Sequence, residues 1–197
     1  RQQPRFRSDP RPEPPPVQEP LIQVHGHTNG LKASQVKALE RLLITVQLAD
    51  LARATPEETR AHPASASFPG PVPAEAPRVD RVLDINPKTP DWHSTGLYAA
   101  PGDVVTISID PKDLANHKGW RVRIGCHTDE LWALPRWERV PDIKGSWQIK
   151  EPTTKIASAF GGLIYIDTPK RDTGGAVKVT ISHAVEAPLF TLGMTTN

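Results

Sequence analysis

The sequence has little of several features that would assign it to a familiar class of protein. It holds a single cysteine, Cys126, so an intrachain disulfide is excluded. Acidic and basic residues nearly balance, and the net charge of +2 lacks the basic excess of a nucleic-acid-binding protein. No apolar run is long enough to span a membrane. We therefore expect no nucleic acid as a partner and no membrane span.

The sequence also opens without an initiating methionine and without a signal-like apolar stretch. We therefore expect it to be a processed or partial chain.

Proline, in contrast, is abundant and indicates how the chain is divided. Seven of the first twenty residues are proline, and residues 62–77 form a second segment rich in proline and alanine. Such segments have little apolar surface to bury, and each proline lacks a backbone donor. We predict a largely extended leader at 1–33, a helical element at 34–61, a linker at 62–77 and one domain at 78–197.

The helical element shows the spacing of an apolar helix stripe. Val36, Leu39, Leu43 and Val46 recur at three- and four-residue intervals, which predicts a helix over residues 34–54. Thr55-Pro56-Glu57-Glu58 then has the cap, proline and glutamate of a second helix start.

From Val79 onward the pattern changes to short strands separated by turn signals. The predicted strands are Val79–Ile85, Val104–Ile109, Trp120–Cys126, Trp147–Ile149, Lys155–Ala157, Leu163–Ile166, Val177–Ile181 and Leu189–Leu192, with loops at 86–91 and 168–175. This pattern predicts a mainly β chain, folded as an antiparallel β-sandwich of the jelly-roll or galactose-binding-like kind.

The strand at Trp120–Cys126 alternates most clearly. Its period of two predicts that Trp120, Val122, Ile124 and Cys126 face the core, so Cys126 is expected to be a buried structural residue. Cys126 and His127 cannot form a catalytic dyad with each other, because neighbours on a strand point to opposite faces.

A polar corner follows this strand. His127 and Asp129 can share a face, where they could contact a sugar or a protein partner. With a third ligand they could instead be part of a metal site. The third-ligand candidates are His93, Glu138 and His183. The alternative is a purely structural corner in which Asp129 accepts hydrogen bonds from the backbone.

Tryptophans supply the remaining candidate ligand-binding residues. Trp132 and Trp137 lie close to Arg139, and Trp92 precedes a Ser-Thr pair. Exposed tryptophans beside charged groups stack on sugar rings, but tryptophans also close the cores of sandwiches. Both interpretations remain open at this point.

Four ordered blocks carry a resemblance to a known family. They are R-V-R-I-G-C-H-T-D at 121–129, S-T-G-L-Y at 94–98 with Pro101-Gly102, the segment 157–166 with its F-G-G-L-I-Y-I, and A-P-L-F-T-L-G at 187–193. Together they make the chain from Val79 to Asn197 similar to the enhancin-like, mucin-degrading zinc metallopeptidases. The resemblance implies a β-sandwich immediately before a catalytic domain, in a secreted or periplasmic protein that acts on glycoproteins.

The catalytic motif of such peptidases is missing from the sequence. It requires H-E-x-x-H on a helix, and no histidine in this chain is followed by glutamate. We therefore expect no catalytic residue and no cofactor in this chain, with zinc in a C-terminal catalytic domain of the same protein.

The hypothesis is a non-catalytic N-terminal region that supports this catalytic domain and contacts glycans of glycoproteins. The alternatives are a stand-alone carbohydrate-binding module and a structural interaction domain.

Overall fold

The computed structural model describes residues 33–170, 172 and 174–189. The chain divides into two compact units, 1–43 and 44–197. The described part of the first unit is the beginning of helix α1 (Ala33–Leu51), which matches the helix predicted from the apolar stripe. The leader predicted for 1–33 lies outside the described residues except for Ala33, and the strand predicted at Leu189–Leu192 lies outside them except for Leu189.

The second helix predicted from Thr55 is wrong beyond its first turn. The backbone N–H and the hydroxyl of Thr55 both donate to Glu58 Oε2, at 2.9 and 2.8 Å, so the capping interaction itself forms. No helix continues from this turn: residues 59–62 are irregular, the N–H of His62 donates to the carbonyl of Ala159 at 2.8 Å, and Pro63 follows directly. The chain then makes only a short 3-10 helix at Pro63–Ala66.

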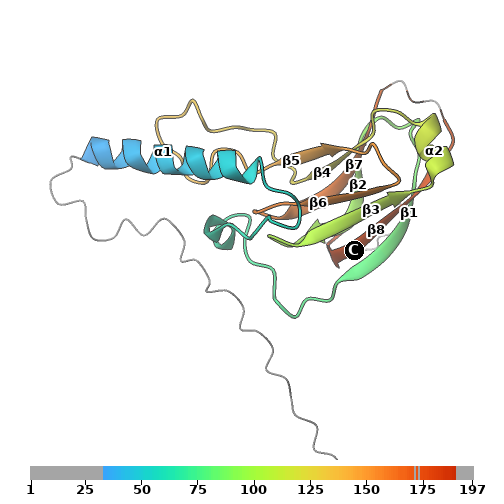
Figure 1. Ribbon diagram of the computed structural model, residues 1–197, viewed down its shortest axis with the longest axis horizontal. Helices are drawn as coiled ribbons and strands as arrows, with labels where there is room; N and C mark the ends of the chain where they lie inside the picture. The colour runs from blue at the N-terminus through green and yellow to red at the C-terminus, as the bar shows by residue number, and fades with distance from the viewer. Residues whose placement is uncertain (1–32, 171, 173, 190–197) are drawn as a thin grey trace, which may run out of the picture. The chain divides into compact units, whose positions relative to one another are not determined.

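The second unit is mainly β, as predicted. Its strands are β1 (Val79–Ile85), β2 (Asp91–Ala99), β3 (Val104–Ile109), β4 (Arg121–Ile124), β5 (Gly145–Gln148), β6 (Thr153–Ala157), β7 (Gly162–Thr168) and β8 (Val177–Glu186), with a short helix α2 at Pro111–Asn116. Every pairing among these described strands is antiparallel. The order is β5-β4-β7-β2-β8-β3-β6, and β1 pairs with β8 (Figure 1).

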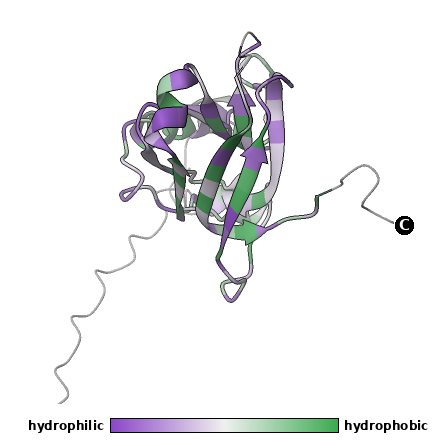
Figure 2. Ribbon diagram, turned by 90° about the vertical axis from the view of Figure 1, so that its right-hand side faces the viewer, coloured by the Kyte–Doolittle hydropathy of each residue, from purple (hydrophilic) through white to green (hydrophobic). Residues whose placement is uncertain are grey.

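Strand β8 connects two layers of a β-sandwich-like fold. It pairs along most of its length with β1 and β3, whereas only Val185 and Glu186 reach β2. Apolar and polar residues alternate along the strands, as Figure 2 shows by colour. The apolar faces enclose a core whose largest fully buried side chains include Trp120, Ile107 and Ile166. None of the helices in the described part of the chain is long and apolar enough to cross a membrane.

Strand β2 was not predicted from the sequence, although it lies between β7 and β8. Its pairing with β7 is interrupted by a bulge between Ser94 and Tyr98. Within the bulge the Thr95 hydroxyl donates to the carbonyl of Ile164 at 2.7 Å, and Gly96 has φ +67°. Burial still alternates along β2, but the buried Thr95 is polar and the exposed Trp92 is apolar, so the sequence lacks the apolar–polar alternation by which a strand is recognised.

The predicted burial of Cys126 is wrong: this cysteine is exposed. Strand β4 ends at Ile124, and Gly125 has φ +91°, which breaks the alternation one residue before the cysteine. Gly162 of β7 lies against this turn, because a Cβ on Gly162 would come within 2.7 Å of Gly125 N. Two backbones therefore approach here more closely than side chains would allow.

A second, smaller apolar cluster lies within the unit formed by residues 44–197. Val140, Ile143, Ala159 and Phe160 are buried together. Partly buried side chains from the C-terminal half of α1, including Leu48 and Leu51, pack against them. The predicted domain boundaries at 61–62 and 77–78 stay predictions.

Candidate functional site

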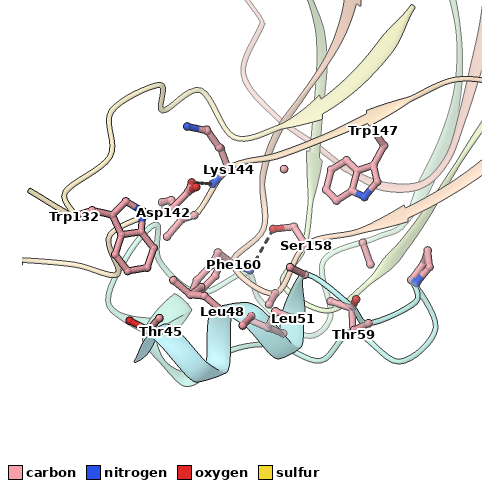
Figure 3. A pocket seen from close by; sticks show the side chains of 18 residues that line it. Thr45, Leu48, Leu51, Thr59, Trp132, Asp142, Lys144, Trp147, Ser158 and Phe160 are labelled. Carbon is pink, nitrogen blue, oxygen red and sulfur yellow. Dashed lines mark hydrogen bonds between the residues drawn. The ribbon is translucent and has the colours of Figure 1, made fainter. Parts of the chain in front are cut away.

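A cavity of about 490 Å³ lies beside the second apolar cluster (Figure 3). Its walls come from the C-terminal half of α1, the turn at Pro56–Thr59, the loop that carries Trp132, the segment 142–147 and the segment 157–160. Predicted site residue Trp132 is 38% exposed and forms part of the wall. The second predicted residue, Trp137, contacts Trp132 edge-on, with ring centroids 5.4 Å apart. The structure thus brings these two tryptophans together.

Trp147, which was not among the predicted site residues, and Phe160 add two further aromatic rings to the cavity wall. The ring of Trp147 occupies the space above Gly145, since a Cβ on Gly145 would fall 2.0 Å from the ring. Asp142 and Lys144 add polar groups, and Lys144 is also ion-paired with Glu130. Aromatic walls with a few polar groups are the usual composition of a small-molecule or sugar site.

Three predicted residues gather at the polar corner after β4. The guanidinium of Arg139 donates to Asp129 at 2.6 Å, and His127 Nδ1 lies 3.6 Å from the other oxygen of Asp129. Phe68 joins the corner from the proline-rich segment, with its ring centroid 5.1 Å from the His127 ring and 5.6 Å from the Arg139 guanidinium carbon. Phe68 lies 59 residues before His127 in the chain, so no local pattern predicts that it belongs to this corner.

The carboxylate of Asp129 at this corner is largely neutralised by its neighbours Arg139 and His127. Although partial burial acts to raise it, the pKa of Asp129 lies below its ordinary value, because a backbone hydrogen bond, Arg139 and His127 stabilise the carboxylate. The suggested third metal ligands lie in other contacts: His93 bonds to Thr89 and Thr168, Glu138 pairs with Arg136, and His183 approaches Asp103. Among the described residues no group of three or more His, Cys, Asp or Glu side chains could hold a metal ion.

The remaining predicted residue, Trp92, lies on the outer face of the sheet formed by β5, β4, β7 and β2. Its ring stacks with the guanidinium of Arg123, whose central carbon is 4.2 Å from the ring centroid. Tyr165, the cross-strand neighbour of Arg123, completes the group, with its ring centroid 5.5 Å from that of Trp92. We call Trp92, Arg123 and Tyr165 the outer-face cluster.

Arg123 is unusual within this cluster because two of its nitrogens, Nε and Nη1, are buried and have no hydrogen-bond partner among the described residues. Arg121, two residues earlier on the same face, differs: it donates to the hydroxyl and the carbonyl of Ser146 at 2.9 and 3.1 Å. Burial first, and then the charge of nearby Cys126, raises the pKa of Tyr165. The phenol therefore stays neutral well above neutral pH.

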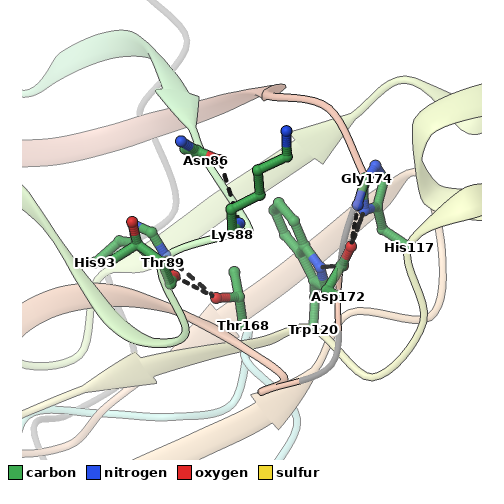
Figure 4. A network of polar contacts seen from close by, with 9 residues as sticks. All are labelled: Asn86, Lys88, Thr89, His93, His117, Trp120, Thr168, Asp172 and Gly174. Atoms are coloured by element: carbon green, nitrogen blue, oxygen red, sulfur yellow. Dashed lines mark hydrogen bonds and ion pairs between the residues drawn. The ribbon is translucent and has the colours of Figure 1, made fainter.

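A buried polar network that sequence reasoning missed holds the loop after β7 (Figure 4). The carboxylate of Asp172 accepts from Trp120 Nε1 at 2.7 Å, from His117 Nδ1 at 2.8 Å and from the N–H of Gly174 at 3.0 Å. Gly174 is necessary because a Cβ there would lie 2.0 Å from the His117 ring. Fifty-five residues separate His117 from Asp172, so no spacing rule could have paired them.

Asp172 is strongly held as an anion. Burial of the carboxylate acts to raise its pKa, but the hydrogen bonds from Trp120, His117 and Gly174 and the charge of His117 together outweigh burial, so the pKa of Asp172 is lowered. The donors on His117 and Trp120 are buried and that on Gly174 is partly buried, so the carboxylate of Asp172 anchors the loop to the fold. The arrangement is structural.

Residues 74–182, more than half of the chain, match the model of the N-terminal domain of M60-like peptidases. The chain belongs to this family. The matched range covers β1 to most of β8 and so includes the outer-face cluster, the Asp172 network and the polar corner except for Phe68.

Several relatives of the M60-like N-terminal domain are much longer proteins. Human TRPM8 channel-associated factor 2 is 36% identical over 124 residues, which cover 62% of this chain and 13% of that protein. The zebrafish (Danio rerio) homologue is 31% identical over 105 residues, 53% of this chain and 11% of that protein. Among solved structures, the IMPa metallopeptidase of Pseudomonas aeruginosa is 20% identical, with a TM-score of 0.43, and the match covers 65% of this chain and 14% of IMPa.

The residues present do not fit a catalytic zinc ion. The sequence contains no His-Glu pair, and the corner of His127 and Asp129 is closed by Arg139. Asp129 therefore already has a cationic partner. We derive no chemical step through a metal in this chain.

Proposed function

We propose that this chain is the non-catalytic N-terminal region of a secreted or periplasmic zinc metallopeptidase that acts on glycoproteins such as mucins. Its role is to support the catalytic domain of the same protein and to help shape the substrate cleft. The observation that carries the proposal is the match of residues 74–182 to the N-terminal domain of M60-like peptidases, in a sequence without H-E-x-x-H. Zinc and the general base belong to the catalytic domain.

We propose further that the chain contacts the glycan of the substrate at the cavity beside Trp132. Three features support this: the ring of Trp132 is partly exposed at the cavity wall, Trp147 supplies another ring, and Asp142 supplies a carboxylate. A tryptophan face packs against the C–H face of a pyranose, while carboxylates and hydroxyls accept or donate hydrogen bonds to sugar hydroxyls.

The catalytic assignment is tested by cleavage. The purified chain, supplied with zinc, should leave a mucin-type glycopeptide intact, whereas a longer polypeptide that includes H-E-x-x-H should cut it and a chelator should stop the cutting. Chelator-sensitive cleavage by the chain alone, abolished by His127→Ala, would contradict the proposal and would place a metal site at the polar corner.

The glycan contact is tested by titrating the chain with a neutral mucin-type disaccharide while backbone amide signals are followed by NMR. Trp132→Ala should abolish the shifts, and Trp92→Ala, on the outer face of the sheet, should leave them unchanged. Equal binding by the unsubstituted chain and by Trp132→Ala would remove the cavity from the proposal. Strong binding by the chain alone would favour the stand-alone carbohydrate-binding module.

A second candidate function is a structural interaction domain. The identities of 36–37% to TRPM8 channel-associated factors of several mammals favour it, because the name of these relatives describes association with a channel. The two candidates differ in what the chain binds. Direct binding of the purified chain to TRPM8, without binding to any glycan, would favour the interaction domain.

A further inference from the structure

We propose that Arg123 and Trp92 form a second ligand site on the outer face of the sheet, which binds an acidic sugar through its carboxylate. The inference rests on the proposed function only in that the ligand is a glycan; its site, its residues and its ligand charge differ from those of the cavity beside Trp132.

The first argument is the state of the Arg123 charge. Nε and Nη1 are buried and unpartnered among the described residues, and no ion pair there joins this guanidinium to a carboxylate. A desolvated cation without an anionic partner is costly in a folded protein. Stacking on Trp92 at 4.2 Å offsets only part of this cost. An anion that reaches this guanidinium should therefore gain more binding free energy than it would at an ordinary surface arginine.

The second argument is access. Arg123 is half-buried rather than buried, and only Nε and Nη1 are covered without a partner. Nη2 is therefore the donor left for a ligand. A carboxylate that accepts from Nη2 neutralises the whole delocalised guanidinium, even while Nε and Nη1 stay covered. Stacking on Trp92 fixes the plane of the group, so little side-chain entropy is lost on binding.

The third argument is the chemistry around Arg123. Trp92 is 37% exposed and offers an apolar ring, as a pyranose requires. The strand register places hydrophilic side chains around the pair: Ser146 and Tyr165 opposite Arg123, Ser94 opposite Tyr165, and Asp167 opposite Trp92. These groups can bond to sugar hydroxyls.

The same surroundings argue against an acidic segment of a protein as the occupant. A stable protein interface needs an apolar centre from which charged residues are largely excluded. The outer face instead places Arg121, Asp167, Ser94 and Ser146 around the two neighbouring rings of Trp92 and Tyr165. A ring with many hydroxyls and one carboxylate matches this face better.

The test is an NMR titration of the chain with the methyl glycoside of N-acetylneuraminic acid, with methyl galactoside as the neutral probe. The indole N–H of Trp92 should shift with the acidic sugar and not with the neutral one. Arg123→Met should weaken binding roughly tenfold or more, as expected for loss of a hydrogen bond to a charged group.

Arg121→Met is the matched control, because it removes the same charge from the same strand and face but from a guanidinium that Ser146 already satisfies. It should change the affinity less than about twofold, as a rim charge does. If Arg123→Met does not fold, Arg123→Lys replaces it, since the point charge of lysine lacks the planar stacking and should also weaken binding.

Three results would overturn the inference: no binding of the acidic sugar, equal weakening by Arg121→Met and Arg123→Met, or binding of a capped aspartyl peptide in place of the sugar. Each can be told from failure of the proposed function. Binding of the neutral disaccharide, and its loss in Trp132→Ala, tests the cavity alone and does not depend on the result at the outer-face cluster.

Discussion

Removing the carboxylate of Asp172 should be among the most destabilising polar substitutions in this chain. Asp172→Ala deletes the acceptor of three donors, of which Trp120 Nε1 belongs to a side chain only 1% exposed. A buried donor left without a partner costs about 1–3 kcal/mol, and the substitution removes the acceptor of two buried donors, Trp120 Nε1 and His117 Nδ1. We therefore expect the free energy of unfolding to fall by roughly 2–5 kcal/mol at pH 7, measured by urea denaturation.

The matched control is Asp84→Ala on β1, since Asp84 pairs with Lys178 at 3.0 Å and both side chains are mostly exposed. An exposed pair of this kind contributes about 0–1 kcal/mol. If Asp172→Ala costs no more than Asp84→Ala, the network does not stabilise the fold and our reasoning fails.

The effect of Asp172→Ala should also depend on pH in one direction. The pKa of Asp172 is lowered in the folded protein, so the carboxylate stabilises the fold fully above its unfolded pKa of about 3.9. This contribution is lost as the pH falls below that value and through the folded pKa. The difference between the unsubstituted chain and Asp172→Ala should therefore shrink below about pH 4. A difference that grows with acidity would contradict the assignment of charge.

Three further predictions concern the turn after β4, which lies against β7, and the core. Cys126 should react with a thiol reagent in the native chain as fast as a free thiol, and protection until unfolding would contradict its exposed position. Ile124→Ala, which removes a fully buried side chain, should lower the free energy of unfolding by about 2–5 kcal/mol in denaturant titration. Gly162→Ala should destabilise the fold, because its Cβ would meet Gly125 N at 2.7 Å, and a melting temperature equal to that of the unsubstituted chain would refute this contact.

Strand prediction succeeded where one face of a regular strand is buried. Val104–Ile109 has the predicted bounds because inward and outward residues alternate without interruption. Val79–Ile85 also has the predicted bounds, although its pairing with β8 is irregular between Val79 and Arg81 and both Arg81 and Val82 are exposed. The prediction failed at β2 and at Cys126 for different reasons. In β2 burial does alternate, but apolar character does not, because Thr95 is buried whereas Trp92 is exposed. At Cys126 the positive φ of Gly125 breaks the period of two itself.

The candidate site could be predicted only where it is local in the sequence. His127, Asp129 and Arg139 lie within thirteen residues and do meet at one corner. The stacking of Arg123 on Trp92 depends on β7 lying between β4 and β2, which is a property of strand order. The period of two predicts only that Arg123 points outward. It does not predict that Nε and Nη1 are buried without a hydrogen-bond partner among the described residues.

The position of β8 in the strand order has a consequence for how the protein is made. It is the last of the described strands along the chain, yet β1 has no other partner among them, and β3 and β2 both pair with it. During synthesis on the ribosome the edges of these earlier strands therefore stay unpaired until residues 177–186 leave the exit tunnel. Unpaired edges of this kind are where nascent chains aggregate or recruit chaperones. Translation that stalls before Val177 should therefore release a product that is cleared rather than folded.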